Sequence, residues 1–295
     1  MNNEKLEMMK IKKGFIAALD QSGGSSSKTL AKYGIDETKY STEEEMFDLI
    51  HEMRKRVFTS KSFSNKYIIG AILFERTMNS KVNDEFTADY LWNNKKILSF
   101  LKVDKGLVDE ENGVKLMKAI PTLREDLQVA KSRNIFGTKM RSVIYEANEQ
   151  GIKDIVNQQF KFAKIICEEG LVPIIEPEVD INSNEKEKCE EILKREIISH
   201  LKEWNNDDKI MFKFTLPSVS NFYLELYDFE CVVRIVALSG GYSLDKAVEL
   251  LSKNKNMIAS FSRALLDDLR VSQTQEEFDN KLNEVIVKIY NASIE

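Results

Sequence analysis

Residues 210–217, Ile-Met-Phe-Lys-Phe-Thr-Leu-Pro, form the stretch on which the interpretation of the fold depends. The run is short and apolar, with a polar segment before it and Pro217 at its end, a pattern typical of a fully buried strand. Side chains alternate between the two faces of a strand. One face is therefore expected to carry Met211, Lys213 and Thr215, and the other Ile210, Phe212 and Phe214.

The lysine inside this strand, Lys213, allows two interpretations. Burial disfavours the charged form of a lysine, so Lys213 could supply a neutral amine that attacks a carbonyl group. Alternatively, Lys213 is paired with a carboxylate at the mouth of a barrel or sheet and has only a structural role. The strand by itself favours neither interpretation, and the rest of the chain has to separate them.

Composition and charge exclude several classes of protein. The chain has 295 residues, 42% of them hydrophobic and 31% charged, with a net charge of -5. This balance gives no support to a surface for nucleic acid or for an anionic membrane. The first residues lack a signal peptide, and no run is long enough to cross a bilayer. Three cysteines without CxxC spacing indicate reduced thiols, so a cytoplasmic protein is expected.

A histidine-bound metal is not expected in this chain. His51 and His200 are the two histidines, and neither lies near another ligand at the spacing of a zinc site. Both are interpreted as solvated helix residues. We therefore expect neither a metal nor a cofactor.

Eight short apolar runs alternate with helical patterns along the chain. The runs are residues 15–19, 68–74, 98–103, 135–140, 172–176, 210–216, 232–238 and 257–261. Helices are expected after residue 40, around residue 90, and over residues 123–133, 152–169, 185–204 and 278–290. This count is that of an α/β (β/α)8 TIM barrel, with a doubly wound open sheet as the alternative. No linker or change of composition divides the chain, so residues 1–295 are predicted to form a single catalytic domain.

Two local signals place helix ends. Ser41 and Glu44 have the spacing of a capping box, which predicts Ser41 as the N-cap of the helix after Tyr40. Gly170 follows the long amphipathic segment and predicts its C-terminal end.

Charged residues stand at the carboxyl ends of most of the predicted strands. The residues are Asp20, Lys102, Asp104, Lys105, Lys139, Arg141, Glu176, Glu178, Lys213 and Arg263. Buried strand ends normally carry few charges, and barrels gather their chemistry at these ends. Because charges of both signs converge there, a functional site is predicted at the mouth of the barrel, the end at which the strands have their carboxyl ends.

One anion site is predicted in the loops after the seventh and eighth strands. Ser239, Gly240 and Gly241 are expected to open a helix, whose backbone N–H groups and dipole can hold an anion. Arg263 follows the next strand and can add a forked donor. These loops are where barrels commonly bind phosphate.

A second, weaker cradle for phosphate is predicted after the first strand. It comprises the loop from Ser22 to Ser25, with Lys102 as a candidate cation. Two anion sites across one mouth imply a substrate that is phosphorylated at both ends.

Seven stretches carry a resemblance to a known family. They are FIAALDQSGGS, FLKVDKG, FGTKMRS, PIIEPEV, MFKF, LSGGYS and SFSRAL, in this order from Phe15 to Leu265. The sequence resembles class I (Schiff-base) fructose-bisphosphate aldolase in its bacterial form. The resemblance implies reversible cleavage of fructose 1,6-bisphosphate to dihydroxyacetone phosphate and glyceraldehyde 3-phosphate in glycolysis or gluconeogenesis, without a cofactor.

The resemblance also implies roles for individual residues. Lys213 would form the imine, Glu176 would act as acid and base in imine formation, and Asp20 would be the base at the C4 hydroxyl. Lys139 and Glu178 would be positioning and electrostatic partners, with Arg141 near the substrate. One phosphate would be held by Ser239, Gly240 and Arg263, and the other by Ser22, Ser25 and Lys102.

Three positions depart from the animal members of the family. Animal members use a C-terminal tail that ends in tyrosine for a proton transfer at the carbanion. This chain ends in YNASIE, and Tyr290 is predicted to belong to the last helix. Ser262 stands where animal members have glycine, and Gln21 stands where they have an acidic residue.

Other classes of function were weighed against this one. Transaldolase and deoxyribose-phosphate aldolase share the lysine chemistry, but neither needs two phosphate cradles. A phosphosugar-binding scaffold would lose Lys213 or Asp20, and both are present. Metal-dependent aldolases are disfavoured by the shortage of histidine. The expected partner is a small sugar phosphate, with no nucleic acid and no membrane, and the sequence leaves open whether the protein is a homo-oligomer.

Overall fold

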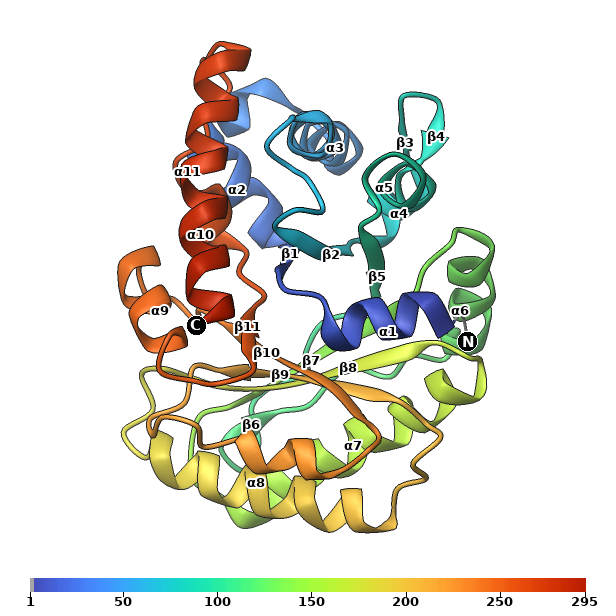
Figure 1. The fold of residues 1–295 in the computed structure, drawn as a ribbon, viewed down its shortest axis with the longest axis vertical. Helices are drawn as coiled ribbons and strands as arrows, with labels where there is room; N and C mark the ends of the chain where they lie inside the picture. The colour runs from blue at the N-terminus through green and yellow to red at the C-terminus, as the bar shows by residue number, and fades with distance from the viewer. Residues whose placement is uncertain (1–2) are drawn as a thin grey trace.

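Eight parallel strands close into a barrel in the computed structural model, which describes residues 3–295 (Figure 1). Neighbouring strands pair in the order β1-β2-β5-β7-β8-β9-β10-β11. Their bounds are β1 Phe15–Leu19, β2 Ile68–Leu73, β5 Leu98–Lys102, β7 Gly137–Ile144, β8 Val172–Val179, β9 Ile210–Thr215, β10 Val232–Leu238 and β11 Met257–Ala259. A backbone hydrogen bond of 3.1 Å from Ala18 to Phe261 joins the first strand to the end of the last. The predicted (β/α)8 barrel is confirmed.

Helices surround the barrel on the outside. In Figure 1, α7 and α8 cover its lower side, α2, α3 and α11 its upper left side, and α4 and α5 its upper right side. The α-helices are α1 Asn3–Ile11, α2 Gly24–Tyr33, α3 Glu43–Thr59, α4 Glu75–Asn79, α5 Thr87–Lys95, α6 Leu123–Ser132, α7 Glu149–Glu168, α8 Lys186–Glu203, α9 Leu244–Leu251, α10 Arg263–Leu266 and α11 Gln275–Ile294. The short elements are η1 Glu37–Lys39, β3 Lys81–Val82, β4 Glu85–Phe86, β6 Val114–Lys115 and η2 Leu224–Asp228. Within residues 3–295, no helix is both long and apolar enough to cross a membrane.

The N-terminal helix α1 closes the barrel at the amino ends of the strands. Met9 is fully buried and packs in the barrel interior with Ile16 and Ile69, near the starts of β1 and β2. The Arg234 guanidinium, near the start of β10, donates to the Met9 carbonyl at 2.7 and 2.9 Å and to the Lys12 carbonyl at 3.2 Å. Because α1 occupies this end, the strands are open to solvent only at their carboxyl ends.

Strand β9 has the two faces that alternation predicts. Met211 packs in the barrel interior, whereas Ile210, Phe212 and Phe214 pack between the barrel and its helices. Phe214 stacks on Tyr223 with ring centroids 3.9 Å apart. Lys213 therefore points into the barrel, above Met211.

Strands β7 and β8 are longer than the sequence predicted. The predicted run 135–140 starts two residues before β7 and ends four residues too early, since β7 is Gly137–Ile144. The predicted run 172–176 also ends too early, since β8 continues to Val179. The two strands stay in register as far as the pair Ile144 and Val179. Arg141 and Ser142 in β7 and Glu178 in β8 interrupt the apolar pattern, so the apolar run that marks a buried strand ends before the strand does.

The predicted start of α3 is wrong by one residue. Thr42 is the N-cap, and its side-chain oxygen accepts from the Glu45 backbone N–H at 3.1 Å. The Glu45 carboxylate accepts in turn from the Ser41 backbone N–H at 2.6 Å. Three consecutive glutamates made the register of the cap ambiguous in the sequence. The predicted end of α7 is confirmed, because Gly170 adopts a φ of 78° just after the helix.

Candidate active site

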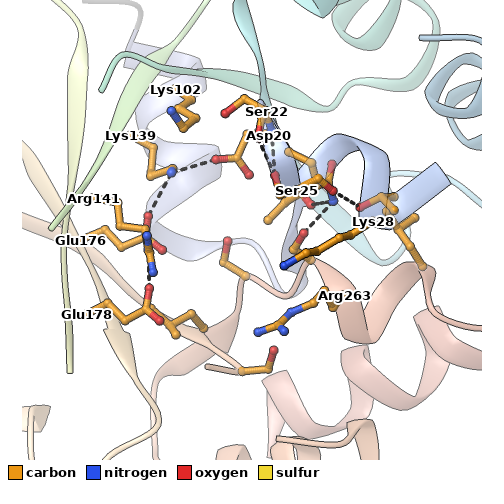
Figure 2. A pocket seen from close by; sticks show the side chains of 18 of the residues that line it. Asp20, Ser22, Ser25, Lys28, Lys102, Lys139, Arg141, Glu176, Glu178 and Arg263 are labelled. Atoms are coloured by element: carbon orange, nitrogen blue, oxygen red, sulfur yellow. Dashed lines mark hydrogen bonds and ion pairs between the residues drawn. The ribbon is translucent and has the colours of Figure 1, made fainter. Parts of the chain in front are cut away.

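A cavity of about 690 Å³ opens at the carboxyl ends of the barrel strands (Figure 2). This is a common size for a small-molecule site. The predicted site residues that line it are Asp20, Ser22, Ser25, Lys102, Lys139, Arg141, Glu176, Glu178, Lys213, Ser239, Gly240 and Arg263. Gly241 lies next to the lining and does not contribute to it. The structure thus brings twelve of the thirteen predicted residues to one cavity.

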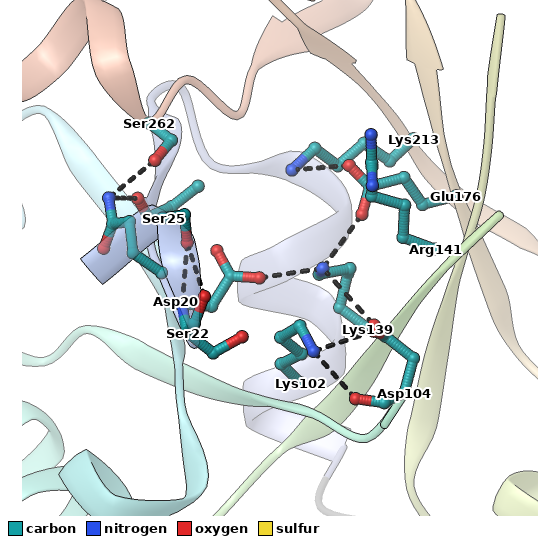
Figure 3. A network of polar contacts seen from close by, with 12 residues as sticks. Asp20, Ser22, Ser25, Lys102, Asp104, Lys139, Arg141, Glu176, Lys213 and Ser262 are labelled. Carbon is teal, nitrogen blue, oxygen red and sulfur yellow. Dashed lines mark hydrogen bonds and ion pairs between the residues drawn. The ribbon is translucent and has the colours of Figure 1, made fainter. Parts of the chain in front are cut away.

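Lys139, on β7, is the cation at the centre of the cavity floor (Figure 3). Its Nζ lies 2.8 Å from Asp20 Oδ2, 3.1 Å from Glu176 Oε2 and 3.7 Å from Asp104 Oδ2. Burial by itself lowers the pKa of Lys139, but the three carboxylates outweigh it and raise this pKa above its ordinary value. Lys139 is therefore a fixed positive charge at neutral pH.

Lys213 and Glu176 form the second contact of the cavity floor. Lys213 Nζ lies 3.0 Å from Glu176 Oε1, and the side chains of both residues are about one-twentieth exposed. The contact follows from strand register, since Ile174 and Met211 are paired neighbours and the next inward residues are Glu176 and Lys213. One carboxylate thus bridges two amines, Lys213 through one oxygen and Lys139 through the other.

Asp20 stands directly after β1 and faces the cavity, as the sequence predicted. Burial by itself raises the pKa of Asp20, but Lys139 and Lys213 outweigh this and lower it. The carboxylate is therefore ionised throughout the neutral range and is available to accept a proton.

Asp104 is a member of the cluster that the sequence analysis noted at a strand end but did not select as a site residue. Its Oδ1 lies 2.7 Å from Lys102 Nζ, and its backbone carbonyl accepts from the same amine at 2.7 Å. Burial raises the pKa of Asp104, but Lys139 and Lys102 lower it below its ordinary value overall. The signal for Asp104 was its position two residues after Lys102, which puts both side chains on one side of an extended chain.

Positive and negative charges balance within this buried cluster. The cations are Lys102, Lys139 and Lys213, and the anions are Asp20, Asp104 and Glu176. Charges held this far from water need partners, and here each amine has at least one carboxylate. The cluster can move protons between neighbours without changing its net charge.

Arg141 and Glu178 form a separate ion pair beside the cluster (Figure 2). Arg141 lies two residues beyond Lys139 on β7, and Glu178 two residues beyond Glu176 on β8, so both face the cavity. Burial by itself lowers the pKa of Arg141, but Glu178 outweighs it and raises this pKa. The Arg141 side chain remains 38% exposed and can reach a ligand from the cavity wall.

The loop after β10 has the backbone conformation of an anion cradle. Gly240 and Gly241 have φ angles of 61° and 118°, which residues with a Cβ rarely adopt. A Cβ on Gly240 would also lie 2.7 Å from the Ile181 side chain. The expectation that these glycines open a helix is corrected, because α9 begins at Leu244, with Ser243 as its N-cap.

Arg263 faces this loop from the end of β11. Its Nη2 atom lies 3.7 Å from the position of a Cβ on Gly241. Within residues 3–295, no hydrogen bond or ion pair holds the guanidinium, so its donors are free for a ligand.

The loop after β1 is closed on itself by its serines. Ser25 Oγ donates to the Ser22 carbonyl at 2.8 Å, and the Ser22 backbone N–H donates to Ser25 Oγ at 3.0 Å. Lys28 lies on α2, three residues after Ser25, and in Figure 2 its amine points into the cavity above Arg263. The sequence analysis passed over Lys28, although a lysine one helical turn after the loop was a usable signal.

Several candidate groups lie outside the cavity. Tyr290 belongs to α11, as predicted, and packs edge-on against Tyr67 with centroids 5.1 Å apart. His51 and His200 lie on α3 and α8 and bond to nearby carbonyl oxygens. In the described part of the chain, no group of three or more histidine, cysteine or acidic side chains is arranged to hold a metal ion.

The fold and the site define a (β/α)8 barrel with a buried amine–carboxylate centre in a cavity that the loops after β1 and β10 also line. Sequence comparison then names the family, because the family described as "Fructose-bisphosphate aldolase class-I" matches residues 2–221. A curated relative from Clostridium acetobutylicum, "Fructose-bisphosphate aldolase class 1", is 57% identical over 294 residues, which cover 100% of both chains. The chain belongs to the class-I fructose-bisphosphate aldolase family.

A solved structure agrees with this assignment at the level of the fold. It is the fructose-bisphosphate aldolase of Plasmodium falciparum, crystallised with TRAP and a small-molecule inhibitor. It superposes with a TM-score of 0.77 at 19% identity, over 98% of this chain and 93% of the other. The barrel of the aldolases is thus retained at low sequence identity.

Proposed function

We propose that this protein is a lyase that cleaves fructose 1,6-bisphosphate reversibly through an imine on Lys213. The observation that carries the proposal is the contact of 3.0 Å between Lys213 Nζ and Glu176 Oε1 at the mouth of the barrel. The contact puts a proton acceptor beside the Lys213 amine, which must be neutral to attack a ketone. Family membership supplies the substrate, and the two loops suited to phosphate are consistent with it.

Imine formation needs a proton acceptor next to the amine, and Glu176 is in place. Glu176 takes a proton from Lys213, and the neutral amine adds to the C2 carbonyl of the open-chain sugar. The added nitrogen then gives a second proton to the C2 oxygen, which becomes a hydroxyl. Glu176 then returns the proton to the C2 hydroxyl, which leaves as water and gives a protonated imine. Lys139 stays 3.1 Å from Glu176 and stabilises the carboxylate each time it re-forms.

Cleavage follows from the protonated imine. Asp20 removes the proton of the C4 hydroxyl, and the C4–O bond becomes the carbonyl of glyceraldehyde 3-phosphate. The electrons of the C3–C4 bond move into the imine and leave an enamine on Lys213. Protonation at C3 and hydrolysis of the imine release dihydroxyacetone phosphate.

The two phosphates are assigned to the two loops. Ser239, Gly240 and Gly241 form one site with Arg263, whose unpaired donors suit a phosphate. Ser22, Ser25 and Lys102 form the other, and Arg141 with Glu178 lies along the wall between Glu176 and solvent. Lys102 is held by Asp104 at 2.7 Å, so it would act on the phosphate as a fixed neighbouring charge.

Borohydride trapping tests the proposal. Reduction in the presence of dihydroxyacetone phosphate should add the mass of the reduced triose phosphate to the peptide containing Lys213, and Lys213→Arg should abolish the adduct. Lys202→Arg, an exposed lysine of α8, is the matched control and should label like the wild type. Labelling mainly on a different lysine would overturn the assignment of Lys213.

The remaining assignments extend the same proposal. We take residues 1–295 to form one catalytic domain that acts in the cytoplasm on a small sugar phosphate, with no nucleic acid or membrane partner and no metal or other cofactor. A homo-oligomer is compatible with this assignment. Light scattering of the purified protein measures the oligomeric state directly.

A further inference from the structure

The buried guanidinium of Arg54 has no role in the chemistry described above. Arg54 lies on α3 and is 1% exposed. Within the described residues, no carboxylate lies within ion-pair distance of its guanidinium. Its hydrogen-bond acceptors are neutral: Thr77 Oγ1 at 2.7 Å, the Gln21 carbonyl at 2.7 Å and Gln21 Oε1 at 3.0 Å. Burying an arginine without a carboxylate is costly, so a reason for its position is required.

The contacts of Arg54 converge on the residue after the proposed base. Gln21 follows Asp20 directly, and Arg54 holds it by both its backbone carbonyl and its side-chain carbonyl. Burial lowers the pKa of Arg54 to about 10, with Asp20 acting in the opposite direction. Arg54 therefore stays charged at neutral pH and fixes the backbone from which Asp20 projects.

Gln21 also connects the loop after β1 to the segment after β11. The two strands are the first and last of the barrel, and the joint between them is its seam. While its Oε1 accepts from Arg54, its Nε2 donates to Ser262 Oγ at 2.6 Å. Ser262 directly precedes Arg263, the proposed phosphate donor. A glutamine suits this position because one end of an amide accepts while the other donates.

The seam that this bridge crosses is the weakest joint of the barrel. Among residues 3–295, no register of paired residues connects β1 with β11, and the joint has the backbone bond of 3.1 Å from Ala18 to Phe261. The loops that follow these two strands carry Asp20 and Arg263. More distant contacts also join the segments after these strands, such as the ion pair of 2.8 Å between Lys32 and Asp267, but the Gln21–Ser262 bond is formed by residues adjacent to Asp20 and Arg263 themselves.

The bridge also links two positions noted in the sequence. Gln21 and Ser262 are two of the positions at which this chain departs from the animal members of the resembling family. The structure shows that these two residues touch each other.

We propose that Arg54, Gln21 and Ser262 are positioning residues that hold Asp20 and Arg263 at the spacing required by one sugar bisphosphate. The inference rests on the proposed function, since it uses the roles of Asp20 and Arg263. The bridge touches neither the substrate nor Lys213. It acts through the two loops, and its loss lets the base and the phosphate donor move relative to each other.

Two substitutions, alone and combined, cut the bridge at its Gln21–Ser262 link. Gln21→Met and Ser262→Ala should each lower kcat/KM for fructose 1,6-bisphosphate by about 10–100-fold, the effect of a small misplacement of reacting groups. The double variant should be no worse than Gln21→Met alone, because that variant already lacks both the link to Ser262 and the side-chain acceptor for Arg54. Borohydride trapping of saturating dihydroxyacetone phosphate on Lys213 should be unchanged, since that step does not need Asp20.

Two further variants separate positioning from loss of stability. Ser262→Thr keeps the hydroxyl and should restore most of the activity lost in Ser262→Ala. Gln158→Met is the matched control, because Gln158 also bridges two groups, the Met117 backbone N–H and carbonyl, each at 2.9 Å, away from the cavity. It should leave kcat/KM unchanged. Arg54→Met is less informative alone, since a buried residue of this size can be needed for folding.

The outcomes are distinct from those for the proposed function. Near-normal kcat/KM in folded Gln21→Met, or effects of the two single variants that multiply in the double variant, would overturn the bridge. The same holds if Gln158→Met is as damaging as Gln21→Met, because the loss would then reflect stability. If the wild type cleaves no sugar phosphate and labels no lysine, the proposed function fails instead.

Discussion

Lys139 Nζ lies 2.8 Å from Asp20 Oδ2 and 3.1 Å from Glu176 Oε2, so a single ammonium joins the two carboxylates to which the proposed mechanism assigns proton transfers. Glu176 is in contact with Lys213 through its other oxygen. Imine formation and carbon–carbon cleavage therefore use adjacent parts of one charge network (Figure 3). Substitution of Asp20 should stop cleavage and spare imine formation, whereas substitution of Lys139 should damage both steps.

Asp20→Ala is expected to stall cleavage while sparing imine formation. Removing a positioned base commonly lowers the rate by ~10²–10⁴-fold. Lys213 and Glu176 remain in contact, so borohydride should trap the uncleaved six-carbon sugar on Lys213. Mass spectrometry of the peptide containing Lys213 distinguishes the six-carbon adduct from the three-carbon one.

Asp20→Asn tests ionisation at this position rather than packing, since the amide has nearly the size of the carboxylate. It should behave as Asp20→Ala does. Near-normal cleavage in both variants would remove Asp20 from its role, and so would the loss of all trapping in a folded protein.

Lys139→Met is expected to destabilise the folded protein as well as to inactivate it. Lys139 is 2% exposed, and without it Asp20, Asp104 and Glu176 lose a shared cation. Removing one partner from a buried ion pair typically costs about 3–5 kcal/mol of unfolding free energy. Urea denaturation measures this loss, and Lys131→Met on the exposed face of α6 is the control. Equal stability of the two variants would contradict the central role of Lys139.

The barrel was predictable because its strands are buried on both faces. Such strands appear in a sequence as continuous apolar runs, and each of the eight predicted runs overlaps a strand. The prediction failed at the ends of β7 and β8, where polar residues interrupt the apolar run. Arg141 and Glu178 there line the cavity, so the sequence pattern changed where the site begins.

The site was predictable where a charge interrupts an apolar run or ends it. Lys213, Glu176 and Asp20 are of this kind, and the structure brings them to one cavity. Asp104 also directly follows a predicted run, but charged or loop-forming residues surround it there, and the pattern does not show that its carboxylate is buried beside Lys102 and Lys139. Arg54 was missed because it follows Met53 on an amphipathic helix rich in charges, and sequence alone does not distinguish a buried arginine from a solvated one.

Gly137→Ala is expected to destabilise the barrel. Gly137 begins β7, and a Cβ there would lie 2.2 Å from the Val172 carbonyl oxygen and 2.8 Å from the Phe100 ring. Backbone and a buried ring cannot move aside, and overpacking of this kind costs about 1–3 kcal/mol or more. Gly24→Ala is the control, since a Cβ there meets nothing within 4 Å. Thermal unfolding that starts at the same temperature in both variants would contradict the close packing at Gly137.

Activity is expected to survive a strong chelator. In the proposed mechanism the protonated imine on Lys213 accepts the electrons of the breaking bond, so no Lewis acid is required. The rate of cleavage of fructose 1,6-bisphosphate after dialysis against EDTA should equal the rate before it. Loss of activity with EDTA and recovery with zinc would show that the imine mechanism is wrong for this chain.

The stability of the protein should depend on pH through Asp20 at the acid end. The pKa of Asp20 is lowered from its ordinary value of 3.8, because Lys139 and Lys213 outweigh the effect of burial. The unfolded chain therefore binds this proton at a higher pH than the folded protein does. The contribution of Asp20 to the unfolding free energy is fully present above pH 3.8 and is lost as the pH falls through the lower, folded pKa.

The contribution of Lys139 to the unfolding free energy depends on pH in the opposite direction and is lost at alkaline pH. Its pKa is raised above the ordinary value of 10.5, so its contribution is fully present below that pH and is lost as the pH rises through the folded pKa. The pair therefore leaves stability nearly independent of pH in the neutral range. Asp20→Asn should lower stability at pH 7 and flatten its decline on the acid side, by up to ~1.4 kcal/mol per pH unit for one proton.

Urea denaturation of the wild type and of Asp20→Asn at several pH values from neutral to well below 3.8 measures both effects. Asp109→Asn is the control, because Asp109 is exposed and lies outside the cavity. It should keep the acid-side slope of the wild type. If Asp20→Asn also keeps that slope, the Asp20 carboxylate is not held ionised by Lys139, and the contact of 2.8 Å does not carry the interaction assigned to it.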